Sequence, residues 1–155
     1  MSNCKKPVFP IALLLFFLGA CSHNELFFEF HSINNSNWQR ENPATFSVDI
    51  QDSLAVYEIW VEVRNNDDYP YRNIWLFIDY QTPEGRLRSD TINADLADVY
   101  GKWHGKGLSL HTLSIPYEKP VRFSTCGVHT WTIRQGMREN PLKGISDIGL
   151  KVLRE

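Results

Sequence analysis

The sequence has no apolar run long enough to cross a membrane as a helix. Its most apolar stretch, the uncharged run from Val8 to Ala20, has 13 residues, whereas a membrane-spanning helix needs about 20. A transmembrane anchor is therefore a poor explanation of this stretch. Its flanks indicate an export signal, because Lys5 and Lys6 precede it and the small residues Gly19 and Ala20 end it.

A cysteine follows directly after these small residues. Leu18-Gly19-Ala20-Cys21 resembles the lipobox of bacterial lipoproteins. The resemblance implies a diacylglyceryl thioether on the Cys21 sulfur, cleavage of a signal peptide at residues 1–20, and acylation of the new amine. Several acyl chains would anchor the protein firmly to the lipid bilayer, because a single chain binds only reversibly. An ordinary signal peptide followed by a chance cysteine is the alternative.

Few acidic residues follow Cys21. The segment Ser22-His23-Asn24-Glu25 lacks the Asp that retains some lipoproteins at the inner membrane. It also lacks the run of acids that directs some lipoproteins of Bacteroidota to the cell surface. By this resemblance we expect the protein on the periplasmic face of the outer membrane.

Little cysteine remains once the signal peptide is removed. Cys4 leaves with it and Cys21 is lipidated, so Cys126 is the only other thiol and an intramolecular disulfide is excluded. The remaining 135 residues must rely on an apolar core. We expect Cys126 to be buried in that core, because nothing near it in the sequence marks the base that a nucleophilic thiol needs.

The chain also lacks an excess of positive charge. It has 16 basic and 18 acidic side chains, and Lys5 and Lys6 leave with the signal peptide. The mature chain therefore has a net charge of −4. This balance argues against a nucleic-acid partner and against electrostatic binding to anionic lipid.

Alternating apolar and polar residues predict β-strands in most of the mature chain. Residues 21–43 hold the lipidated cysteine and a polar, asparagine-rich segment, although Phe27, Phe28 and Phe30 indicate that a first strand starts early. The domain proper is expected over 44–155. Strands are predicted within 44–51, 57–64, 74–78, 87–92, 108–117, 121–123, 128–135 and 148–152.

Three of these segments carry a more specific expectation. The strand over 74–78 is apolar on both faces and is expected to be central and covered on each side. Residues 93–107 break the alternation, and we expect one helical turn followed by a glycine-rich loop. Between Leu110 and Leu113 the apolar residues change parity, which we interpret as a bulge or a bend between sheets.

Eight or nine short strands without a convincing long helix predict an all-β protein. Turn-forming residues separate the strands, as in "RNNDDYPYRN" (64–73) and "TPEG" (82–85). Each sheet has one apolar face to bury, so an antiparallel β-sandwich, Ig-like or jelly-roll-like, is the economical fold.

The sequence contains no pattern that marks an enzyme, a metal site or a cofactor site. The histidines form no HxH pair, no HExxH and no Cys/His cluster. "GKWHGKG" (101–107) lacks the spacing of a phosphate-binding loop, and Asp67 and Asp68 are explained by turn formation. We therefore expect a non-enzymatic protein without a metal or a cofactor.

Aromatic residues are plentiful and leave one alternative function open. Trp60 lies on the polar face of its strand and Trp103 lies in a loop. Exposed rings of this kind stack on sugars, so the chain could be a lipid-anchored glycan-binding module. The other explanation is that Trp60 packs under a covering element and that Trp103 closes one end of the sandwich.

Several segments together resemble one family. They are "VRNNDDYPYRNIWLFI" (63–78), "DTINADLADVYGKWHGKG" (90–107) and "PVRFSTCGVHTWTIRQGMRENPLKGISDIGLKV" (120–152), together with the lipobox. This combination is similar to the gliding-motility lipoprotein GldH family of Bacteroidota. The sequence departs from the usual pattern at His104, where an aliphatic residue is expected, and at "STCG" (124–127), which replaces a turn that usually contains proline.

The resemblance implies an accessory lipoprotein of the gliding-motility and type IX secretion machinery, with other envelope proteins of that machinery as partners. It implies no catalytic residues. Polar residues of the matching segments are candidate contacts with such a partner, although both segments could merely shape turns. One set of candidates lies in the first matching segment and consists of Arg64, Asn65, Asn66, Asp67, Tyr69 and Tyr71. The other set lies in the second and third segments and consists of Trp103, Lys106, Gln135, Met137 and Arg138.

Overall fold

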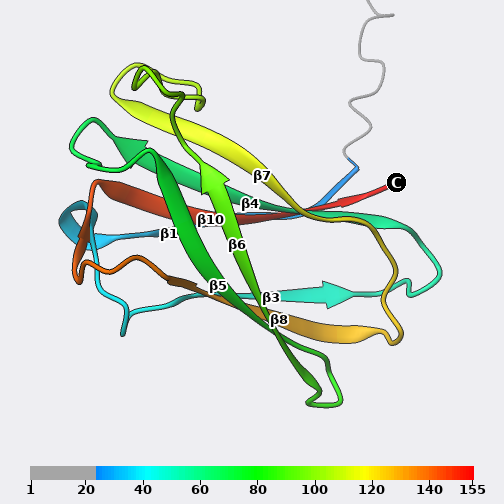
Figure 1. Ribbon diagram of the computed structural model, residues 1–155. Coiled ribbons are helices and arrows are strands. Elements are labelled where there is room, and N and C mark those ends of the chain that lie inside the picture. The colour runs from blue at the N-terminus through cyan, green and yellow to red at the C-terminus, as the bar shows by residue number, and fades with distance from the viewer. Residues whose placement is uncertain (1–23) are drawn as a thin grey trace, which may run out of the picture.

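Ten strands and one short 3-10 turn make up residues 24–155, the part of the chain that the computed structural model describes (Figure 1). The prediction of an all-β fold is confirmed. In chain order the elements are β1 (Glu25–Ser32), η2 (Asn34–Ser36), β2 (Asn37–Trp38), β3 (Ala44–Ile50), β4 (Tyr57–Asn66), β5 (Asn73–Gln81), β6 (Leu87–Asp95), β7 (Leu110–Val121), β8 (Gly127–Gln135), β9 (Leu142–Lys143) and β10 (Ile145–Arg154).

The strands form two antiparallel four-stranded sheets. The first sheet has the order β1-β10-β4-β7 and the second has the order β3-β8-β5-β6, while β2 and β9 form a small ribbon. In Figure 1 the strands β4, β7 and β10 of the first sheet lie above β3 and β8 of the second sheet, and β5 and β6 run steeply across the front of the view. The predicted β-sandwich is therefore the fold of the described chain.

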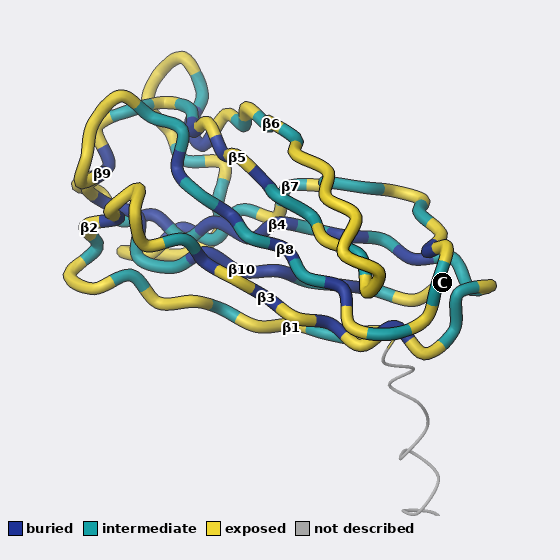
Figure 2. The backbone as a smooth tube through the Cα atoms, turned by 90° about the horizontal axis from the view of Figure 1, so that it is seen from below, coloured by how far each residue is buried: buried dark blue, intermediate teal, exposed yellow. Residues whose placement is uncertain are grey.

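The core lies between the two sheets and is built by the alternation seen in the sequence. In β3 every second residue is buried, from Ala44 to Ile50, and in β8 the buried side chains include Trp131 and Ile133. Figure 2 shows buried residues along β4, β8 and β10, and largely exposed edge strands β1 and β6. Burial of these side chains is the main stabilisation of a chain that has no disulfide among its described residues.

Two seams close the sandwich along its edges. At one edge the ring of Phe27 in β1 packs edge-on against Phe46 in β3, with centroids 6.4 Å apart. At the other edge the Tyr117 hydroxyl of β7 donates to Asp90 of β6 at 2.5 Å, and Arg88 pairs with Glu118. One seam is apolar and the other is polar.

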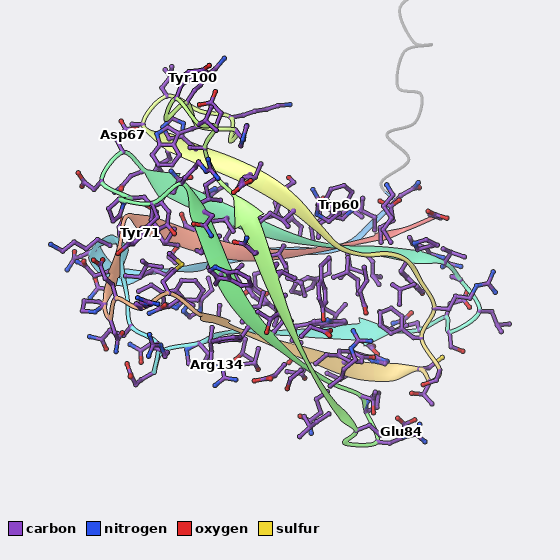
Figure 3. The ribbon with its side chains drawn as sticks, in the orientation of Figure 1. Trp60, Asp67, Tyr71, Glu84, Tyr100 and Arg134 are labelled. Carbon is purple, nitrogen blue, oxygen red and sulfur yellow. The ribbon has the colours of Figure 1, made fainter. Side chains whose placement is uncertain are left out.

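The chain enters and leaves the sandwich at the same end. The backbone N–H of Arg154 donates to the carbonyl of Asn24 at 2.6 Å. The opposite end, which we name the far end, consists of the loops at residues 67–72, 96–109 and 136–141. Figure 3 shows Asp67, Tyr71 and Tyr100 at the far end and Glu84 away from it.

The expectation for β5 was only half right. This strand is central, because it lies between β8 and β6, and Ile74, Leu76 and Ile78 are fully buried. However, Trp75 and Phe77 on its other face are 43% and 40% exposed. The second sheet is covered on one side only, so its apolar outer residues face solvent.

The helical turn expected within 93–107 is absent. β6 continues to Asp95, and the chain then forms turns in which the Asp98 carboxylate accepts the backbone N–H groups of Tyr100 and Lys102 at 2.8 and 2.9 Å. This side chain offers the backbone an alternative to a helix. The loop then lies against β7 through a pair of 2.9 Å bonds between Lys106 and Thr112.

The change of parity in β7 does not mark a bulge. β7 pairs with β4 in one register from Leu110 to Pro116, and the irregularities come later, opposite Tyr57–Trp60. Leu108 is 97% exposed and Leu110 is also exposed, whereas His111 takes the inward position. The two leucines made this segment look like a strand with an apolar face, but their side chains face solvent.

The expectation for Cys126 was also wrong. This cysteine is exposed rather than buried in the core. It lies in the turn before β8, where its thiol donates to the carbonyl of Gln51 at 3.3 Å. The inward positions next to it are taken by the aromatic side chains of Phe123 and His129.

Candidate interaction surface

Three segments that lie far apart in the sequence meet at the far end. The carbonyl of Arg72 accepts the backbone N–H groups of Leu96 and Ala97 at 2.7 and 3.0 Å, which joins the first loop to the second. The backbone N–H of Gly136 donates to the carbonyl of Trp75 at 2.7 Å, which joins the third loop to β5. The three loops are therefore one connected surface.

Asp67 fastens the first two loops to β7. Its carboxylate accepts hydrogen bonds from His111 Nε2 at 2.9 Å and from Trp103 Nε1 at 3.2 Å. The rings of Trp103 and His111 stack, with centroids 5.7 Å apart. The hydrogen bond from His111, and next the one from Trp103, hold the pKa of Asp67 below its usual value although burial opposes this.

Asp67 thus does more than the turn formation expected from the sequence. The turn itself is closed by its neighbour, because Asn66 Oδ1 accepts the backbone N–H of Asp68 at 3.0 Å. Asp67 is then free to bond to a different loop. Trp103 closes this end of the sandwich, as one of the two explanations of its position predicted.

Tyr71 stands between two grooves of the far end. One groove, of about 380 Å³, is lined by Tyr71, Asn73, Trp75 and residues 136–138. The other, of about 330 Å³, is lined by residues 69–72, part of 97–101 and Trp103. The carboxylate of Glu139, through a hydrogen bond, raises the pKa of the Tyr71 hydroxyl. A tyrosine that separates two hollows is well placed to contact a bound molecule.

The first groove combines apolar and cationic side chains. Trp75 lies against Met137, whose sulfur accepts the Trp75 backbone N–H at 3.4 Å. Arg138 is exposed beside them, and its guanidinium makes no ion pair with a described residue. Such a groove can bind an aromatic or aliphatic side chain while its guanidinium pairs with a carboxylate.

Some of the predicted contact residues have a structural role inside the domain instead. Asn65, Tyr69 and Gln135 are buried and cannot face a partner. The Tyr69 hydroxyl donates to the carbonyl of Asn73 at 2.7 Å, and the Gln135 amide donates to the carbonyl of Glu139 at 2.9 Å. These buried polar groups hold the loops in place, as their hydrogen bonding requires.

The other predicted residues divide between two places. Arg64 lies away from the far-end grooves, on the outer face of the first sheet, with its guanidinium 3.7 Å from the centre of the Phe30 ring. The remaining candidates accompany the far-end loops: Asn66, Asp67, Tyr71, Trp103, Lys106, Met137 and Arg138. Sequence reasoning missed Trp75, because a fully apolar strand gave no sign that one face is exposed.

Neither tryptophan of the proposed glycan platform is fully exposed. Trp60 is half-buried on the outer face of the first sheet, between Lys119 and Lys151 at 5.2 and 5.4 Å from its ring centre. Trp103 is half-buried against His111. The two rings lie on different parts of the molecule and do not form one platform.

Another hollow of the described chain lies away from the predicted contacts. It has about 620 Å³ and is lined by residues of the segment 31–43, largely asparagine and other polar side chains together with Trp38. Trp38 is buried and donates its indole N–H to the carbonyl of Asn42 at 2.9 Å. The asparagine-rich segment joins the rest of the domain elsewhere, where the backbone N–H of Gly144 donates to the carbonyl of Ser36 at 2.8 Å.

Residues 24–155 lack the grouping of side chains that a metal site needs. No three side chains of His, Cys, Asp or Glu in this range lie close enough together to hold a metal ion. The same range contains no helix with the length and apolar character to span a membrane. The proposed lipid attachment at Cys21 and the signal peptide at residues 1–20 lie outside the described residues.

The comparisons with known proteins agree with the resemblance found in the sequence. The family described as GldH lipoprotein matches residues 25–152. A "Gliding motility lipoprotein GldH homolog" of Christiangramia forsetii is 30% identical over 153 residues, covering 94% of this chain and 92% of the relative. "Gliding motility lipoprotein GldH" of Flavobacterium johnsoniae is 29% identical over 149 residues, covering 91% and 90%. The chain therefore belongs to the GldH lipoprotein family.

Proposed function

We propose that the protein is a non-enzymatic accessory lipoprotein whose far end binds a protein of the gliding-motility and type IX secretion machinery. In this proposal acyl groups on Cys21 anchor it to the periplasmic face of the outer membrane. The role is that of a docking component, in which the domain holds a partner and transforms no substrate.

One observation carries this proposal: loops from three segments of the sequence that resemble the family meet at the far end. Tyr71 and Trp75 come from the first segment, Trp103 from the second, and Met137 and Arg138 from the third. Loops supported by a rigid sandwich are a common location for binding residues. Tyrosine, tryptophan, methionine and arginine are also enriched where proteins bind proteins.

The position of the far end also supports docking. Asn24, three residues after Cys21, lies beside Arg154 at the opposite end of the sandwich. Three residues span at most about 11 Å, so a lipid at Cys21 keeps that opposite end close to the bilayer. The far end is then the part of the domain that extends away from the attachment point.

Substitutions in the first groove test the proposal in the organism that carries this chain. A deletion strain is complemented with the wild-type chain, with Arg138→Glu or with Tyr71→Ser. We expect both variants to reach wild-type levels in the envelope but to lose colony spreading or type IX secretion. Arg122→Glu is the matched control, because Arg122 is also an exposed arginine but follows β7 at the opposite end.

Two results would contradict the proposal. One is normal motility and secretion in the deletion strain itself. The other is equal function of Arg138→Glu, Tyr71→Ser and the Arg122→Glu control. Site-specific cross-linking from position 138, followed by mass spectrometry, then identifies the partner and should fail from position 122.

A second candidate function is glycan binding through Trp75 and Phe77, rather than through Trp60 and Trp103 as the sequence indicated. Trp75 and Phe77 are exposed two positions apart on the outer face of β5. Thr91 and Asn93 of β6 pair with them across the sheet, and hydroxyl and amide groups of this kind bind sugar hydroxyls. Titration with envelope polysaccharides decides this candidate, because Trp75→Ala should abolish binding while Trp60→Ala should not.

A further inference from the structure

The outer face of the first sheet carries an aromatic patch next to the attachment point. Phe28 is 45% exposed and Leu26 is similarly exposed, and Trp60 of β4 lies on the same face. Lys151 of β10 connects the aromatic residues, because its ammonium lies 5.6 Å from the ring centre of Phe28 and 5.4 Å from that of Trp60. Figure 3 shows Trp60 on the upper side of the sandwich and Arg134 on the lower side.

The acids on this face are neutralised by neighbouring cations. Glu58 pairs with Lys119 at 2.8 Å, and Glu62 pairs with Lys151 at 2.7 Å. Glu62 is also buried and accepts the Ser114 hydroxyl at 2.7 Å. The face therefore presents rings and lysine stems to its surroundings, with its carboxylates held in ion pairs.

Tryptophan, phenylalanine and lysine together suit the interface of a lipid bilayer. An aromatic ring occupies the boundary between headgroups and acyl chains, and here the lysine stems pack beside the rings while their ammonium groups neutralise Glu58 and Glu62. The mature chain has a net negative charge, so attraction to anionic lipid does not explain such a contact. The patch needs a tether that holds it at the surface.

The length of chain before β1 supplies that tether. Phe28 lies seven residues after Cys21, and a fully extended chain of this length spans at most about 25 Å. An attached acyl group keeps the patch at high local concentration near the bilayer, which strengthens a contact that would be weak in solution. β1 belongs to the first sheet, so the tether joins the domain in this sheet and not in the second.

We propose that the outer face of the β1-β10-β4-β7 sheet lies on the lipid bilayer, with Phe28 and Trp60 at the level of the headgroups. This inference rests on the proposed lipid attachment at Cys21. The second sheet then faces away from the membrane. Its exposed Trp75 and the groove beside Met137 are left free for a partner.

Phe28 and Phe77 allow a matched test, because they are phenylalanines of nearly equal exposure on the outer faces of opposite sheets. A polarity-sensitive fluorophore is attached to Phe28→Cys or to Phe77→Cys in the acylated Cys126→Ser chain. The protein is reconstituted into phosphatidylethanolamine and phosphatidylglycerol vesicles, some of which contain doxyl-labelled lipid. We expect a blue shift and several-fold stronger quenching at position 28 than at position 77.

Equal quenching at the two positions, or stronger quenching at 77, would overturn the orientation. A blue shift at 28 that doxyl lipid does not quench, and that grows with the amount of protein per vesicle, would show that a second copy covers the face instead. Flotation of the vesicles distinguishes a wrong orientation from a missing lipid anchor. Protein that fails to float with the vesicles contradicts the lipid attachment at Cys21 itself. Leu26→Cys and Thr130→Cys form a second pair if either phenylalanine variant lowers the unfolding midpoint.

Discussion

His111 donates a hydrogen bond to the carboxylate of Asp67 at 2.9 Å, across 44 positions of the chain. The bond links the loop after β4 to the start of β7, and Trp103 adds a second donor from the loop between β6 and β7. Because the two loops border one of the far-end grooves, the shape of that groove depends on this contact.

The Asp67 contact predicts a pH dependence of stability. The pKa of Asp67 is lowered in the folded chain from 3.8, so the folded state favours the ionised form more than the unfolded state does. This contribution to the unfolding free energy is complete above about pH 4 and is lost as the pH falls through the lowered pKa. Urea unfolding of wild type and Asp67→Asn should therefore show a difference near neutral pH that disappears in acid.

Asp68→Asn is the control for this prediction. Asp68 is an exposed neighbour whose carboxylate bonds to no other residue of the described chain. We expect its substitution to leave the pH profile of wild type unchanged. A gap between wild type and Asp67→Asn that stays constant down to pH 2 would refute the assignment.

At Gly144 we expect the single methyl group added by Gly144→Ala to lower the unfolding free energy strongly. The φ of Gly144 is +84°, and an added Cβ would lie 2.4 Å from the backbone of Tyr69. Gly85 has the same φ of +84° but open space around it. We expect Gly85→Ala to cost about 1 kcal/mol of unfolding free energy, and Gly144→Ala to cost clearly more, because the loop after β4 must move. Chemical denaturation measures both, and equal losses would show that the contact with Tyr69 is unimportant.

From the ion pair between the buried Glu62 and the partly exposed Lys151 we expect a non-additive effect in the double mutant. Lys151→Met leaves the Glu62 carboxylate without its cation and should cost about 2 kcal/mol, the value being moderated because Lys151 is partly exposed to water. Adding Glu62→Leu removes the charge and should restore much of the stability. Unfolding of the non-acylated chain tests this, and additive losses would contradict it.

The hydrogen bond between Tyr80 and His129 leads to a prediction about removing a partly buried hydroxyl. The Nε2 of His129 donates to the carbonyl of Thr125 at 3.0 Å, so its Nδ1 accepts the Tyr80 hydroxyl at 2.6 Å. Burial raises the pKa of Tyr80 to about 12, which keeps the donor protonated. Tyr80→Phe should cost about 1–3 kcal/mol, because Nδ1 is left without a partner. The exposed Tyr100 provides the control, since Tyr100→Phe should be neutral in the same unfolding measurement.

The strands could be predicted from the sequence where one face of a strand is apolar and the other is polar. β3 and β8 are of this kind, and their buried residues alternate as expected. The same rule fails where both faces are apolar, as in β5, because side-chain polarity then says nothing about which face is covered. It fails at Leu108 and Leu110 for a related reason, since an exposed leucine is common and a buried histidine needs partners that lie elsewhere in the sequence.

The candidate site was predicted in part. The segments that resemble the family contain Tyr71, Trp103, Met137 and Arg138, and the structure brings these residues to one end. The sequence could not reveal that Asn65 and Gln135 point inward, because the hydrogen bonds that satisfy them form only in the folded loops. It also could not reveal Trp75 as a groove residue, because that depends on the absence of a covering layer.

The last strand of the chain is an inner strand of the first sheet. β10 pairs with β1 on one side and with β4 on the other, so both strands lack this neighbour until residues 145–154 are in place. A chain that lacks this segment cannot complete its first sheet or the core beneath it. Folding of the sandwich must therefore wait until residues 145–154 are available, which makes closure of the sheet a late and non-local event.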